Sequence, residues 1–166
     1  MSNRKRYIIK ALIIYITILN VVISYNLLLS IGELLSKFNI FCLSILLLNI
    51  FTSIFNTIFL FRKELNKNYN SVLLYNSIFC MISGFGLRVA GYIINYNLGA
   101  DLSVYFTKNQ AGIDYGLHYD IYNFVIRLLF YNPNELSGFS IQVNLIMLTI
   151  AVFLFYCYKK SKRYSH

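Results

Sequence analysis

The sequence predicts an all-α integral membrane protein, a bundle of four transmembrane helices, on three observations. Four mostly apolar stretches carry no charged residue: Ala11–Gly32, Phe38–Phe61, Asn68–Leu87 and Leu136–Tyr158. Each has roughly the 20 residues that a helix needs to cross about 30 Å of hydrocarbon. The 166 residues are 58% hydrophobic and 13% charged, against about 25% charged in a typical soluble domain.

Most of the basic residues flank these stretches on one side of the predicted membrane, in the segments 4–10, 62–67 and 159–163, whereas Lys37, Lys108 and Arg127 lie in the two connections on the other side. Because basic flanking residues stay on the cytoplasmic side, both termini are expected to be cytoplasmic, in an N-in/C-in topology. The net charge of +9 is then explained by topology and by attraction to anionic lipid. No nucleic-acid partner is expected, because no basic platform interleaved with aromatic residues accompanies these segments.

The four predicted spans form one membrane domain over residues 1–166. The first, about 8–30, has an apolar stretch longer than the 7–15 residues of a signal-peptide core, so it is expected to be retained. Small and hydrogen-bonding residues recur at helical spacing in each span, as contacts between membrane helices require. In the spans at about 38–61, 72–94 and 138–158 these residues include Asn49, Ser53 and Asn56, then Asn76, Cys80 and Gly84, and finally Asn144 and Ala151.

With Lys10 counted as a flanking residue of the first span, Arg88 is the one charged residue inside a predicted span. Burying an ionisable group in hydrocarbon costs several kcal/mol, which makes such a residue a functional candidate by default. A structural arginine that snorkels to the outer interface is the alternative interpretation. The carboxylates expected outside, Asp101, Asp114 and Asp120, are its predicted partners.

The long outer loop, residues 95–137, is where a specific activity is expected. Leu117–Tyr131 has a helical, amphipathic pattern, which predicts an interfacial helix with its apolar face on the membrane. Asp114, His118 and Asp120 stand close together in sequence, and Arg127 lies on the polar face of the predicted helix. A histidine flanked by carboxylates is suited to metal binding or acid–base chemistry, but solvated loop residues and a docking surface are also consistent with this pattern.

No catalytic constellation is recognisable in the chain, which lacks a P-loop, a dinucleotide fingerprint and a nucleophile elbow. Metal and cofactor sites are therefore not expected, and the residues carry no resemblance to a known family. The favoured hypothesis is a non-enzymatic accessory protein of a cell membrane, in a bacterium with AT-rich codons. Its partner would be a membrane protein or peptide at the outer face, as in bacteriocin immunity or in a subunit of an export or transport complex.

Two other classes of function remain as alternatives to the accessory role. A small-solute transporter or channel would have to be a homo-oligomer, because four spans enclose little volume. A membrane enzyme acting at the outer face would use Asp114, His118 and Asp120. The residues of interest for partner contact are Arg88, Asp114, His118, Asp120 and Arg127.

Overall fold

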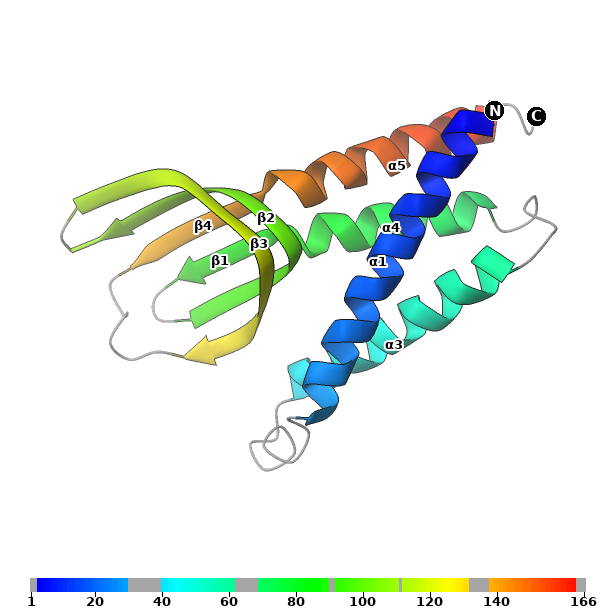
Figure 1. Ribbon diagram of the computed structural model, residues 1–166. Helices are drawn as coiled ribbons and strands as arrows, with labels where there is room; N and C mark the ends of the chain where they lie inside the picture. Colours follow the sequence, from blue (N-terminus) through cyan, green and yellow to red (C-terminus); the bar gives the residue numbers. More distant parts are fainter. Residues whose placement is uncertain are drawn as a thin grey trace. The chain divides into compact units, whose positions relative to one another are not determined.

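The computed structural model describes residues 3–29, 40–61, 69–89, 92–110, 112–131 and 138–163, with backbone only for residues 3, 40–42, 45, 92–98, 122–131 and 163. The elements follow the chain in the order α1 (Asn3–Leu29), α3 (Ile40–Phe61), α4 (Tyr69–Ile82), β1 (Phe85–Val89), β2 (Tyr92–Asn109), β3 (Gly112–Tyr131), β4 (Phe139–Asn144) and α5 (Leu145–Arg163) (Figure 1). They fall into a helical unit, residues 1–78 with 152–166, and a sheet unit, residues 79–151.

The prediction of an all-α, four-span, multi-pass bundle is wrong. Helix α4 ends at Ile82 and strand β1 follows at Phe85, inside the predicted third span. The predicted fourth span, 138–158, begins as strand β4, and the predicted interfacial helix is part of strand β3. Within the described residues, only Arg4–Leu29 forms a helix long and apolar enough to cross a membrane, whereas the apolar helices Leu46–Phe61 and Tyr69–Ile82 are shorter.

The strands form where apolar and polar residues alternate, because successive side chains of a strand point to opposite faces of a sheet. The clearest case is β3, in which Ile113, Tyr115, Leu117, Tyr119 and Ile121 alternate with polar residues or glycine. These apolar types are β-branched, aromatic or leucine, and the first two classes favour strands. A predicted helix over Leu117–Tyr131 uses some of the same leucines and isoleucines, so this alternation is the physical reason that the helix prediction fails.

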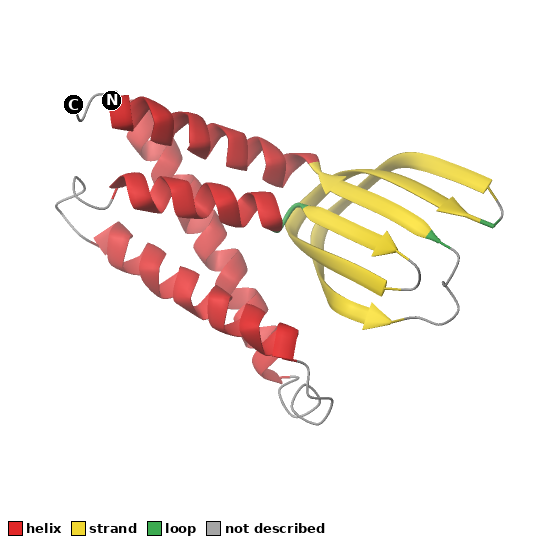
Figure 2. Cartoon of the chain, turned by 180° about the vertical axis from the view of Figure 1, so that it is seen from behind, coloured by secondary structure: helices red, strands yellow, loops and turns green. Residues whose placement is uncertain are grey.

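The four strands form one antiparallel sheet in the order β1-β4-β2-β3, with an additional pairing of β1 with β2 (Figure 2). Each of β1, β2 and β4 pairs with both of the others, so these pairings form a closed circuit. Strand β2 makes this closure by pairing with β1 near Tyr92–Asn95 and with β4 over Ser103–Lys108. Between these two regions the ladder of β2 with β3 shifts register at Gly99, whose φ is 77°.

The shift at Gly99 places one extra residue in β3 between Asp120 and Asn123. Extra residues of this kind bend a strand and increase its twist, and a positive φ is accessible to glycine at little cost. The curvature of the sheet is therefore built into this region of the sequence.

The helical unit buries polar side chains between its helices. Asn56 of α3 and Asn76 of α4 exchange two amide hydrogen bonds of 2.9 and 2.8 Å, and both residues are fully buried. The hydroxyls of Thr52 and Tyr75 lie 2.7 Å apart in the same contact between α3 and α4. The outward surfaces of α1 and α3 carry large apolar side chains instead, among them Ile14, Ile18 and Val21 of α1 and Leu47, Phe51 and Ile54 of α3.

Candidate functional site: the polar face of the sheet

The sheet has one apolar and one polar face, and its register assigns each side chain to one of them. Residues directly opposite on neighbouring strands share a face. The apolar face is formed by Phe85, Leu87, Val89, Leu102, Val104, Phe106, Ile113, Tyr115, Leu117, Tyr119, Phe139, Ile141 and Val143, with Lys108 at one end. The polar face is formed by Arg88, Asp101, Ser103, Tyr105, Thr107, Asp114, His118, Asp120, Ser140, Gln142 and Asn144, together with Gly86 and Gly116.

In a soluble protein the apolar face of a sheet is usually the buried one. Here the buried side chains of the sheet lie on its polar face. Asp101, Ser103 and Asn144 are fully buried, whereas most large side chains of the apolar face are exposed. A buried ionised carboxylate is costly unless it is hydrogen-bonded, and Asp101 meets this condition. Its Oδ1 accepts a hydrogen bond from the Ser103 hydroxyl, and its Oδ2 accepts one from Gln142 Nε2 at 3.2 Å.

Asn144 joins this cluster to the beginning of helix α5. Its Oδ1 accepts hydrogen bonds from the backbone N–H groups of Ile146 and Met147, at 2.9 and 3.2 Å. These are the N–H groups that a helix start leaves without an intrahelical acceptor, and asparagine is among the best capping residues. Its Nδ2 donates to the carbonyl of Ala100 on β2 at 3.1 Å. The Asn144 side chain, at the end of β4, thus caps the start of α5 and also bonds to β2.

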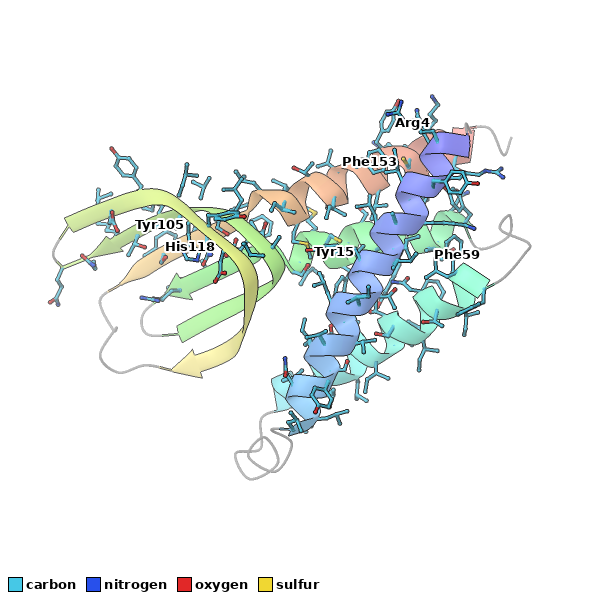
Figure 3. All side chains as sticks on the ribbon, in the orientation of Figure 1. Arg4, Tyr15, Phe59, Tyr105, His118 and Phe153 are labelled. Atoms are coloured by element: carbon cyan, nitrogen blue, oxygen red, sulfur yellow. The ribbon has the colours of Figure 1, made fainter. Side chains whose placement is uncertain are left out.

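Four of the five residues singled out from the sequence lie on the polar face. Arg88 is half-buried on β1, opposite Ser140, and Asp114, His118 and Asp120 are exposed on β3 (Figure 3 labels His118). Asp120 stands opposite Asp101 in the ladder of β2 with β3. The backbone of Arg127 lies in β3 opposite Asn95, and its side chain is outside the described residues.

The strand geometry separates the groups that a metal site would have to bring together. Residues four apart in a strand are about 13 Å apart, because each residue advances roughly 3.3 Å. Asp114 and His118 are therefore not neighbours in β3, as they would be on one face of a helix. Among the described residues, no three His, Cys, Asp or Glu side chains form a group able to hold a metal ion.

Ser103 and His118 are directly opposite in the ladder of β2 with β3. A serine nucleophile needs a base that accepts its proton. In this structure the Ser103 hydroxyl donates to the Asp101 carboxylate rather than to the imidazole of His118. The arrangement stabilises a buried carboxylate, and it does not form the serine–histidine contact of a hydrolase.

Sequence reasoning did not single out Ser103 or Gln142 as members of this cluster, and it treated Asp101 only as a partner for Arg88. The signal was present in β2, where Asp101, Ser103 and Thr107 alternate with apolar residues. The contact with Gln142 joins residues 41 positions apart, and local spacing carries no information about such a pair.

Protein-family models, curated proteins and solved structures were compared with the chain, and none of the three comparisons finds a match.

Proposed function

We propose that this protein is a non-enzymatic accessory protein of a bacterial cell membrane, attached through α1, that contacts a partner protein or peptide through its sheet. Immunity to a membrane-active bacteriocin and a small subunit of an export or transport complex are the roles that fit this description. The observation that carries the proposal is α1, in which the 26 residues Arg4–Leu29 form a helix long and apolar enough to cross a membrane.

The surface of α1 supports attachment to lipid. Ile14, Ile18 and Val21 are about half exposed, and exposed apolar side chains that adjoin one another are unfavourable in water. Arg4, Lys5 and Arg6 begin the same helix, where cationic side chains suit the anionic headgroups of a membrane surface. The buried amide pair of Asn56 and Asn76 is consistent with an apolar environment, in which polar groups bond one another.

The polar face supports the assignment of a partner-binding role to the sheet. Asp114, His118 and Asp120 are exposed there, and Arg88 lies on the same face. Both signs of charge on one face allow a partner to be selected by charge complementarity. On the same face, the hydrogen bonds of Asp101 with Ser103 and Gln142 join strands β2 and β4.

Membrane attachment is tested by flotation of cell extracts and by extraction with alkaline carbonate. The wild-type chain should remain with the membrane, and the double variant Ile14→Asp/Ile18→Asp should appear in the soluble fraction. Thr149→Asp, a substitution at an exposed position of α5, is the matched control and should remain membrane-bound. A mature protein whose intact mass lacks the residues of α1 would refute the anchor, because α1 would then be a cleaved signal sequence.

Partner contact is tested by crosslinking in mild detergent followed by mass spectrometry. A stoichiometric partner crosslinked within residues 95–137 is the expected result. Arg88→Leu should abolish this crosslink and leave membrane attachment unchanged. Lys108→Leu, which removes a charge from the opposite face of the sheet, should preserve it. Retention of the partner by Arg88→Leu would remove Arg88 from the proposal.

A further inference from the structure

Strand β3 is the edge of the sheet. Strands β1 and β4 are paired on both edges, and β2 pairs with β3 on one edge and, on the other, with β1 near Tyr92–Asn95 and with β4 over Ser103–Lys108. Among the described strands, β3 alone has one edge without a partner strand along its whole length, Gly112–Tyr131. A long edge strand presents a row of N–H and C=O groups that another strand can pair with.

The exposure of the apolar face rises at this edge. The exposed large apolar side chains of β1, β2 and β4 have 36% to 44% of their surface exposed. Those of β3 range from 57% at Ile121 to 77% at Tyr115, with Leu117 at 72%. The difference is what a missing neighbour produces, since a fifth strand beside β3 would cover these side chains as β2 and β4 cover one another.

The pattern of β3 indicates which strand fits there. The register places Ile113, Tyr115, Leu117 and Tyr119 of β3 on the apolar face. The alternation along the strand continues to Ile121, so the order of apolar residues reads the same in both directions from Leu117. An antiparallel strand of identical sequence would therefore place leucine opposite leucine, tyrosine opposite tyrosine and isoleucine opposite isoleucine. This stretch also ends where the extra residue between Asp120 and Asn123 interrupts the regular ladder.

We propose that two copies of this chain pair through the outer edges of β3 in an antiparallel, two-fold arrangement centred on Leu117. The interface is self-complementary, as a two-fold dimer requires, and it joins two sheets into one. It does not depend on the proposed membrane role, because it follows from the edge and the sequence of β3 alone.

The same register predicts an unfavourable contact on the polar face. With Leu117 opposite Leu117, Asp114 of each copy lies opposite Asp120 of the other, and Gly116 lies opposite His118. Like charges directly opposite in a ladder are unfavourable. Removing one of them should therefore strengthen the dimer, which is the opposite of the usual effect of an interface mutation.

The register is tested by disulfide trapping of the full chain in mild detergent, with Cys42, Cys80 and Cys157 replaced by alanine. Leu117→Cys should give a disulfide-linked dimer on oxidation, because a residue on the two-fold axis faces its own copy at the separation that a disulfide spans. Ile113→Cys and Ile121→Cys should each fail to crosslink alone and should crosslink when the two proteins are mixed. Equal crosslinking of Ile141→Cys, on the same face away from the edge, would show random collision and overturn the proposal.

The molar mass of the wild-type chain in the same detergent provides a measurement that needs no cysteine replacement. A dimer that Leu117→Lys converts to monomer is expected, whereas a monomeric wild type at all accessible concentrations overturns the proposal. Asp114→Asn should lower the dissociation constant of the dimer between about twofold and thirtyfold. A higher dissociation constant for Asp114→Asn would overturn the register centred on Leu117.

Discussion

The reciprocal amide pair of Asn56 and Asn76 should be among the most sensitive contacts of the helical unit. Asn56→Leu keeps the approximate shape of the side chain and removes both hydrogen bonds of the pair. Asn76 Nδ2 retains its bond of 2.9 Å to the carbonyl of Val72, whereas its Oδ1 is left buried without the donor it had. Two lost hydrogen bonds and one buried acceptor amount to about 2 to 4 kcal/mol of unfolding free energy.

The loss of stability is measured by thermal unfolding in detergent, with circular dichroism as the signal. For a chain of this size the Tm should fall by about 5 to 15 °C. The double variant Asn56→Leu/Asn76→Leu should be more stable than either single variant, because replacing both partners leaves no buried orphan group. Ile58→Ala, at a half-exposed position on the same helix, is the control and should cost under about 1 kcal/mol. Additive losses in the double variant would refute the reasoning, since they would show that the two amides do not depend on one another.

Two further predictions concern the sheet unit. Asn144→Ala should lower the unfolding free energy by about 1 to 2 kcal/mol through loss of the α5 cap. Asn144→Ser should recover part of this loss, because a serine hydroxyl is also a good capping acceptor and carries no charge into the buried position. Equal unfolding midpoints for the two variants would contradict the cap. Burial raises the pKa of the Cys80 thiol from 9.0 to about 12, so the neutral thiol stabilises the folded state below pH 9 and this contribution is lost as pH rises from 9 toward 12. Between pH 8 and pH 11 the free energy of unfolding should therefore fall more for the wild type than for Cys80→Ala. Equal falls in the two proteins would contradict the raised pKa of Cys80.

Helices do occupy the first two apolar stretches identified from the sequence, as α1 and α3. Helices α4 and α5 occupy only part of the third and fourth stretches, which also contain part of β1 and the whole of β4. Absence of charge does not distinguish a membrane helix from an exposed apolar strand. Phe85, Leu87 and Val89 are apolar and uncharged in either structure, and the glycines at 84 and 86 are the local evidence against a continuous helix. The alternation from Ile113 to Ile121 was the readable signal for a strand, and it was outweighed by a helical pattern over the next ten residues.

The composition of the candidate site could be predicted better than its geometry. Arg88, Asp114, His118 and Asp120 were selected for their chemistry, and the register of the sheet places them on one face. Which of them are neighbours depends on pairing between β1 and β4 and between β2 and β3. The first of these joins segments about fifty residues apart, so hydrophobic periodicity within either segment could not specify it. The contact of Asp101 with Gln142 belongs to the same class of long-range information.

The closed circuit of β1, β2 and β4 also determines when the sheet becomes complete during synthesis. Strand β4 is the last of the four in the chain, and it supplies the neighbour for β1 over Phe85–Val89 and for β2 over Ser103–Lys108. Until residues 139–144 have left the ribosome, both of these segments carry an unpaired edge next to exposed apolar side chains. A chain that stops before Phe139 would keep those edges open permanently, and it would be expected to aggregate.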